Sequence, residues 1–99
     1  MAPQKSGGDP ISASSAATFA LRYVGELITS EPTAVTSVEP ADDDCWLVEV
    51  EVLEERRIPS SADMLALYEV ELDHDGALLA YRRTRRYARG RAGLGNGVS

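Results

Sequence analysis

The sequence is poor in the residues on which most catalytic and metal-binding sites depend. Its 99 residues include one cysteine, Cys45, and one histidine, His74. A single cysteine cannot form a disulfide within the chain or a zinc site built on cysteines. A single histidine makes a catalytic zinc cluster or a Ser-His-Asp triad improbable. We therefore expect no cofactor, no metal site and no redox function.

Long apolar segments are also missing. No apolar run approaches the roughly 18–20 residues that a membrane-spanning helix needs. The first eight residues contain one lysine and no apolar stretch, so we expect no secretory signal. Apolar residues make up 43% of the chain and charged residues 26%, which argues against a wholly disordered protein. These features predict one small cytoplasmic domain with no membrane contact.

The net charge of −6 conceals a strong division along the chain. Residues 1–75 hold all 16 acidic residues and four basic ones, whereas residues 76–99 hold six arginines and no acid. A chain divided in this way either pairs its own ends or presents a basic surface to a partner.

Residues 1–10 and 90–99 are rich in polar residues and in glycine, so we expect a disordered lead and a flexible tail. The single domain then covers residues 11–89. Between Ile11 and Ile28, apolar residues recur at the helical period and form one face. This pattern predicts an amphipathic helix whose N-cap is Ser12, Ser14 or the Asp9-Pro10 pair.

Three or four strands are expected after the helix. Thr33 to Glu39 is short and β-branched, whereas Cys45 to Glu55 and Asp63 to Asp73 alternate with a period of two. A turn at Asp73-His74-Asp75-Gly76 leads into a return strand, Ala77 to Tyr87. The order predicts an α+β fold, in which an N-terminal helix packs on one face of a three- to four-stranded antiparallel meander sheet.

The alternation also assigns side chains to the two faces of the sheet. The face expected to meet the helix receives Trp46, Val48, Val50, Val52, Met64, Ala66, Tyr68, Val70 and Leu72. For the last strand we favour the register that buries the larger residues, which places Leu79 and Tyr81 on this core face. In that register Arg82 and Arg86 lie on the other face, beside Glu69 and Glu71. Arg83 and Arg85 then share the face opposite to Arg82.

Acidic residues are numerous, but their spacing does not indicate catalysis or metal binding. Glu49, Glu51, Glu54, Glu55, Glu69 and Glu71 follow the strands in the pattern of a solvated sheet face. The acidic turns at residues 42–44 and 73–76 do not continue into a complete calcium-binding loop. Cys45 has no base near it in sequence, so we do not expect it to be a nucleophile. We predict no catalytic residue and no metal ligand.

The segment from Arg82 to Arg89 is the most distinctive feature of the sequence. One interpretation is that its arginines pair with glutamates of neighbouring strands. The other is that the later arginines, with Tyr87, form a surface for a partner. Exposed ion pairs contribute only about 0–1 kcal/mol each, so stability is a weak reason for so many arginines. Nucleic acid is the less favoured partner, because the acidic remainder of the chain repels a duplex.

An ordered set of short segments resembles the gas vesicle protein O family. In chain order these are VTSV (35–38), Trp46 with VEV (48–50), EERRIP (54–59), YEV (68–70), DHDG (73–76), YRR (81–83) and RRY (85–87). Together they span most of the chain, and EERRIP with the terminal YRRxRRY is the most specific part.

The resemblance implies a non-enzymatic accessory factor in gas vesicle formation, which is cytoplasmic or associated with the gas vesicle. Its partners would be other gas vesicle proteins, either the shell protein or accessory proteins. The residues expected to contact them are Arg56, Arg57, Ile58, Arg82, Arg83, Arg85, Arg86, Tyr87 and Arg89. The alternatives are a nucleic-acid-binding or regulatory module that uses the arginine-rich strand, and a small enzyme or ligand carrier with a pocket between helix and sheet.

Overall fold

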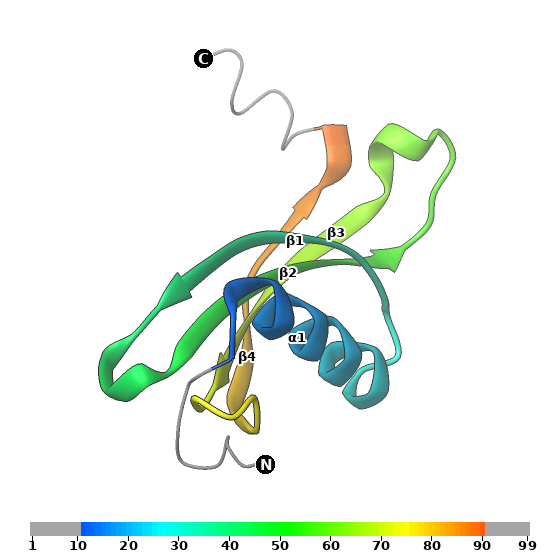
Figure 1. Cartoon of the computed structure of the whole chain (residues 1–99). Coiled ribbons are helices and arrows are strands. Elements are labelled where there is room, and N and C mark those ends of the chain that lie inside the picture. The colour runs from blue at the N-terminus through cyan, green and yellow to red at the C-terminus, as the bar shows by residue number, and fades with distance from the viewer. Residues whose placement is uncertain (1–10, 91–99) are drawn as a thin grey trace, which may run out of the picture.

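The described part of the protein, residues 11–90 of a computed structural model, consists of one helix followed by four strands. These elements are α1 (Ala13–Leu27), β1 (Glu31–Pro40), β2 (Trp46–Glu55), β3 (Met64–Leu72) and β4 (Leu78–Ala88). The strands form one antiparallel sheet in the order β1-β2-β3-β4, and α1 lies against one face (Figure 1). This confirms the expected helix on a meander sheet. The expected lead, and the expected tail apart from Gly90, lie outside the described residues.

The helix begins where the sequence supplies a capping hydroxyl. The Oγ atom of Ser12 accepts a hydrogen bond of 3.1 Å from the backbone N–H group of Ser15, which makes Ser12 the N-cap. Ala16, Ala20 and Val24 recur every four residues and are fully buried. Two of these three residues are alanines, so the helix axis lies close to the sheet.

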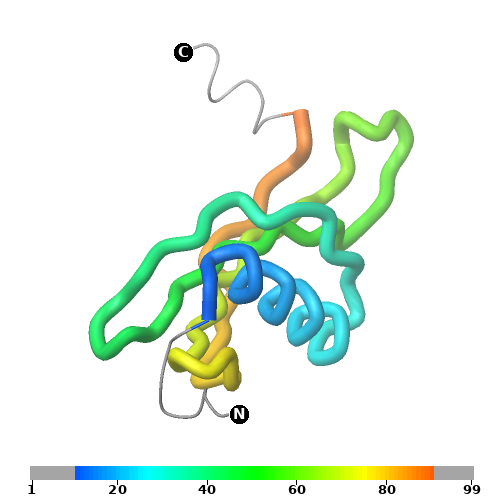
Figure 2. The backbone as a smooth tube through the Cα atoms, viewed as in Figure 1, coloured from blue at the N-terminus to red at the C-terminus, as the bar shows by residue number. Residues whose placement is uncertain are grey.

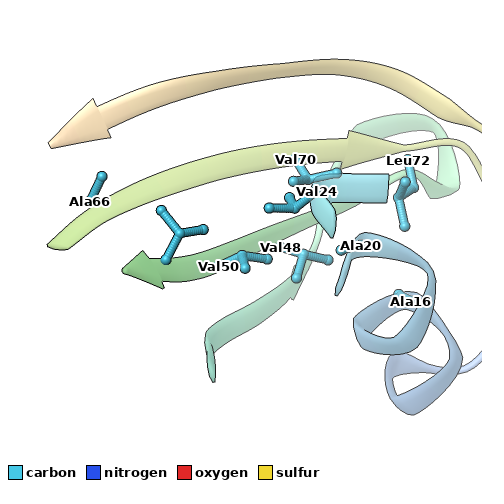
Figure 3. Packing of buried hydrophobic residues seen from close by; sticks show 9 residues of the cluster. Ala16, Ala20, Val24, Val48, Val50, Ala66, Val70 and Leu72 are labelled. Atoms are coloured by element: carbon cyan, nitrogen blue, oxygen red, sulfur yellow. The ribbon is translucent and has the colours of Figure 1, made fainter. Parts of the chain in front are cut away.

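The main core lies between α1 and the two central strands. Its buried members are Ala16, Ala20, Val24, Val48, Val50, Val52, Ala66, Val70 and Leu72. Figure 3 shows these side chains gathered from the helix and the sheet. The alternation predicted for β2 and β3 is confirmed, because Trp46 and Tyr68 also pack against this cluster.

The turn between β3 and β4 fixes the N-terminal half of the helix. Gly76 has a φ of 92°, which L side chains rarely adopt, and a Cβ atom there would lie 2.6 Å from the ring of Phe19. The Oδ1 atom of Asp73 accepts the N–H groups of Asp75 and Ala77, at 2.8 and 2.9 Å. The Tyr23 hydroxyl donates to the Gly76 carbonyl oxygen at 3.2 Å. Glycine at this position therefore lets the helix pack closely against the turn.

The register expected at the start of β4 is wrong at Leu79. Glu71 pairs with Ala80, but Leu72 pairs with Leu78, so a bulge leaves Leu79 without a partner in β3. Leu78 therefore takes the place on the core face, and Leu79 remains 51% exposed. Beyond this bulge the expected register holds, since Tyr81 lies opposite Val70.

A second bulge exchanges the faces of the later arginines. Arg82 lies opposite Glu69 and Arg83 opposite Tyr68, but Arg85 lies opposite Leu67, so Thr84 is the extra residue. The expected position of Arg86 beside Glu69 and Glu71 is therefore wrong, because Arg86 lies opposite the core residue Ala66. Arg83 and Arg86 share the face that carries α1, and Arg82 and Arg85 share the other face.

The face of the sheet away from α1 carries a second apolar group that the sequence analysis did not identify. Leu53, Leu65 and Leu67 are buried there, although no helix within residues 11–90 covers them. Tyr87 lies directly opposite Leu65 in the register and is half-buried. The end of β4 thus helps to shield these leucines from water.

Candidate interaction surface

Two segments that are distant in the sequence meet at one end of the sheet. The loop between β2 and β3 lies at the upper right of Figure 2, and the end of β4 runs towards the same part of the molecule. Asp63 joins them, since its Oδ1 atom accepts the N–H group of Arg57 at 2.7 Å and its Oδ2 atom accepts Nη2 of Arg89 at 3.1 Å. The N–H group of Arg89 also donates to the carbonyl oxygen of Asp63 at 2.8 Å.

Asp63 is the one charged residue that is buried among those the structure describes, with 4% of its surface exposed. The hydrogen bond from the Arg57 N–H group, followed by the hydrogen bond and charge of Arg89, holds the pKa of Asp63 below its usual value against the opposing effect of burial. A buried carboxylate is stable only when paired and hydrogen-bonded, and both conditions are met. Asp63 therefore acts as the structural link between the loop and β4.

Glu55 provides a second link at the same end. Its Oε1 atom accepts Nη2 of Arg57 at 2.8 Å and lies 3.8 Å from Nη2 of Arg86. The hydrogen bond from Arg57 is the main reason why the pKa of Glu55 is lowered. Both pairs are exposed, so each contributes little to stability and mainly positions the guanidinium groups.

Ile58 and Arg56 stand at the outer part of this end. The Ile58 side chain is 98% exposed, whereas apolar residues on the strands are mostly buried. Arg56 donates from Nη2 to Oε1 of Glu31 at 3.1 Å, and both side chains are largely exposed. An apolar side chain thus projects from a loop edged with arginines. We define the loop surface as Arg56, Arg57, Ile58, Arg86 and Arg89.

Glu54 binds two arginines on the face of the sheet that carries α1. Its Oε2 atom lies 3.1 Å from Nη1 of Arg83, and its Oε1 atom accepts Nε of Arg86 at 2.8 Å. The Glu54 side chain is 14% exposed, and the arginines are each about half exposed. Glu54 and Glu55 together therefore face Arg57, Arg83 and Arg86, which leaves one more cation than carboxylates in this part of the surface.

The remaining candidates lie on the opposite face. Arg82 forms an ion pair with Glu69, while the guanidinium of Arg85 lies 5.1 Å from the centroid of the Tyr87 ring. The Tyr87 hydroxyl donates to Oε2 of Glu51 at 2.8 Å. Burial, together with this hydrogen bond, raises the pKa of Tyr87 to about 12. Arg82, Arg85 and Tyr87 therefore lie on the face opposite to Arg83 and Arg86.

The contacts support the first interpretation of the arginine-rich strand, and the partner surface stays a prediction. Arg82, Arg83, Arg86 and Arg89 pair with carboxylates of the chain, as the first interpretation requires. Two of these pairs, Arg86 with Glu55 and Arg89 with Asp63, attach the end of β4 to residues that flank the loop. The sequence analysis missed the linking residues Glu54 and Asp63, because no local pattern marks a carboxylate that bridges distant strands.

The residues considered for nucleophilic catalysis or metal binding do not have the surroundings that these functions require. Burial, with nearby Glu71 and Asp43, raises the pKa of the Cys45 thiol, which is the reverse of what a nucleophilic thiolate requires. Asp73 holds its turn through two backbone N–H groups. Within residues 11–90, no three His, Cys, Asp or Glu side chains are grouped to hold a metal ion. In the same range, no helix has the length and apolar character needed to cross a membrane.

The fold and contacts define a small two-layer α+β protein with an arginine-rich surface at one end of its sheet. The chain belongs to the family Gas vesicle synthesis protein GvpO, whose sequence model matches residues 2–93. No solved structure matches it significantly.

Three curated proteins are similar to this chain. Gas vesicle protein O of a Streptomyces species is 48% identical over 73 residues, which are 74% of this chain and 56% of that protein. Gas vesicle protein O of Haloferax mediterranei is 34% identical over 66% of this chain and 46% of its own length. Gas vesicle protein O1 of Halobacterium salinarum is 30% identical over 89% of this chain and 78% of its own length. The chain thus spans about half the length of the first two relatives.

Proposed function

We propose that the protein is a non-enzymatic, cytoplasmic accessory factor in gas vesicle formation that binds another gas vesicle protein through its loop surface. The family and the names of the relatives support a role in gas vesicle synthesis. The observation that carries the proposal is the placement of Ile58, which is 98% exposed on a loop whose end of the sheet also holds Arg57, fixed by Glu55, and Arg89, fixed by Asp63.

This arrangement suits a protein partner with an apolar pocket and an acidic rim. Burial of an isoleucine side chain contributes about 1.5–3 kcal/mol, and the surrounding arginines supply charge complementarity. The ion pairs keep Arg57 and Arg89 in place before binding, so less side-chain entropy is lost on association. A duplex nucleic acid suits the protein less, because residues 1–75 carry 16 acidic and only four basic residues and repel a duplex.

A pulldown from cells that co-express the rest of the gas vesicle gene cluster tests this proposal. The tagged protein is recovered at low and at high salt, with and without nuclease. We expect another gas vesicle protein to be recovered, less of it at high salt, and no effect of nuclease. Recovery of nucleic acid alone, lost with nuclease, would overturn the proposal in favour of a regulatory module.

Two variants locate the binding surface. Ile58→Asp places a negative charge at the loop tip and should reduce recovery at least fivefold. Thr18→Asp adds the same charge at an exposed position on α1 and should leave recovery unchanged. Equal recovery of the two variants would remove the loop surface from consideration.

A further inference from the structure

The helix covers only part of the sheet face on which it lies. α1 contacts mainly β1 and β2, touches β3 less, and makes few or no contacts with β4. A helix is about 10 Å in diameter and strands lie about 4.8 Å apart, so one helix covers roughly two strands of a four-stranded sheet. Ala66, Val70 and Leu72 of β3 are nevertheless fully buried in the core, so among the described residues it is β4 that has no covering element on this face.

Two tyrosines lie at the border of this uncovered part: Tyr81 on β4, and Tyr68 on β3, which packs against the core. Tyr81 lies opposite Val70, which is fully buried in the layer between helix and sheet, so Tyr81 points to the same side as α1. Its side chain is nevertheless 41% exposed. The centroids of the Tyr68 and Tyr81 rings lie 6.4 Å apart, so the two rings are neighbours on this face. Large rings on the core side of a sheet are normally covered.

Two arginines lie on the same face as this pair of rings. Arg83 lies opposite Tyr68, and Arg86 lies opposite Ala66 on the same face. Both are bound to Glu54, and each keeps about half of its side chain exposed. The tyrosine shelf, defined as Tyr68, Tyr81, Arg83 and Arg86, is thus an apolar strip with an excess of positive charge along one side.

We propose that the tyrosine shelf binds an amphipathic helix of a partner gas vesicle protein, with the apolar side on the tyrosines and acidic residues beside the arginines. The partner helix would lie next to α1 and cover β4 on this face. This inference rests on the proposed function for the source of the partner, but it concerns a surface centred on Tyr81 rather than Ile58.

A strand is a poorer fit than a helix at this place. A strand would have to pair with the free edge of β4, and the bulges at Leu79 and Thr84 interrupt the hydrogen-bonding pattern of that edge. A second copy of this chain is also a poorer fit. Its α1 carries one acidic residue, Glu26, and one basic residue, Arg22, so it lacks the acidic side that the arginines require.

Site-specific photocrosslinking tests the proposal in cells that co-express the gas vesicle gene cluster. Benzoylphenylalanine replaces Tyr81 in one sample, Ile58 in a second and the exposed Thr18 of α1 in a third, and the crosslinked peptides are identified by mass spectrometry. We expect position 81 to crosslink to a helical segment with acidic residues in another gas vesicle protein, and position 18 to remain unlinked.

The other outcomes separate the two proposals. Crosslinks from position 58 but not from position 81 would support the proposed function and overturn the shelf. Crosslinks from position 81 to a second copy of this chain, or to a strand, would overturn the assigned occupant. Absence of crosslinks from both positions would contradict both proposals.

Two substitutions measure the contribution of the shelf to binding. Tyr81→Ser should weaken the recovered complex about tenfold or more, as truncation of an aromatic anchor commonly does. Tyr81→Phe keeps the ring and should bind within about twofold of the wild type. Arg83→Glu reverses one charge at the border and should weaken binding most at low salt. Unchanged binding in Tyr81→Ser and Arg83→Glu would overturn the proposal even if crosslinks form.

Discussion

The Tyr87 hydroxyl on β4 donates a hydrogen bond of 2.8 Å to Glu51 on β2, so this side chain reaches across the whole of β3. Leu65 lies opposite Tyr87, and Leu67 lies opposite Glu51. The tyrosine thus lies over the second apolar group, on the face of the sheet away from α1. This contact explains how leucines remain buried there, and why the end of β4 stays attached to the sheet.

Removal of this hydroxyl should change the stability of the protein at alkaline pH. The pKa of Tyr87 is raised to about 12 in the folded protein, whereas an unfolded tyrosine ionises near pH 10. The neutral phenol therefore stabilises the fold fully below about pH 10, and this contribution is lost as the pH rises towards 12. Tyr87→Phe should lose less stability than the wild type over that interval.

Urea unfolding midpoints measured from pH 9 to 12 would check this. Tyr81→Phe serves as the control, because Tyr81 lies on the other face of the same strand and should keep the wild-type pH dependence. An identical alkaline decline in Tyr87→Phe and the wild type would refute the role assigned to the Glu51 hydrogen bond.

Neutralisation of Asp63 should weaken the fold and reduce its sensitivity to acid. The pKa of Asp63 is lowered mainly by the hydrogen bond from the Arg57 N–H group, so the folded state favours the ionised carboxylate. Its contribution is present above the unfolded pKa of about 4 and is lost as the pH falls through the folded value. Asp63→Asn should lower the Tm by several degrees at pH 7, and the difference from the wild type should shrink below pH 4.

Thermal unfolding followed by circular dichroism between pH 3 and 7 is the appropriate measurement. Asp42→Asn, at an exposed position in the turn after β1, provides the matched control and should leave the Tm at pH 7 almost unchanged. If Asp63→Asn matched this control at every pH, Asp63 would not link the loop to β4.

Gly76→Ala should destabilise the protein by about 1–3 kcal/mol. Alanine at a φ of 92° is strained, and its Cβ atom would lie 2.6 Å from the ring of Phe19. Gly25→Ala, within α1, should have the opposite sign and stabilise by about 0.5–1 kcal/mol. Its Cβ atom would meet the Pro32 Cγ atom at 3.8 Å, an ordinary contact. Urea unfolding of both variants distinguishes the close approach at the turn from a general effect of replacing glycine.

The sequence predicts the helix and the central strands well because their patterns are unbroken. β2 and β3 pair in a continuous register from Trp46 to Leu53, so the period of two assigns every side chain in that span to the correct face. The period of two does not assign side chains to the correct face throughout β4, because single extra residues at Leu79 and Thr84 form bulges there. Neither position carries a glycine or proline that would mark a bulge, so the faces of Arg85 and Arg86 follow from the pairing alone.

The sequence predicts which residues belong to the candidate surface, but it does not predict that they meet at one end of the sheet. The arginines and Ile58 are recognisable from the resemblance of EERRIP and YRRxRRY to family segments. Their meeting depends on Asp63 and Glu55, which act through contacts between residues up to 31 positions apart, such as Glu55 and Arg86. The tyrosine shelf depends on which strands α1 covers, and that is a tertiary property with no local pattern.

The most direct test of the central claim is the gas vesicle content of cells in which this protein is replaced by the Ile58→Asp variant. Gas vesicles scatter light until pressure collapses them, so the turbidity lost on pressurisation measures their amount. The loop surface predicts that Ile58→Asp abolishes most of this turbidity, while Thr18→Asp retains it at similar protein levels. Full turbidity in the Ile58→Asp cells would contradict a role for the loop surface in gas vesicle formation.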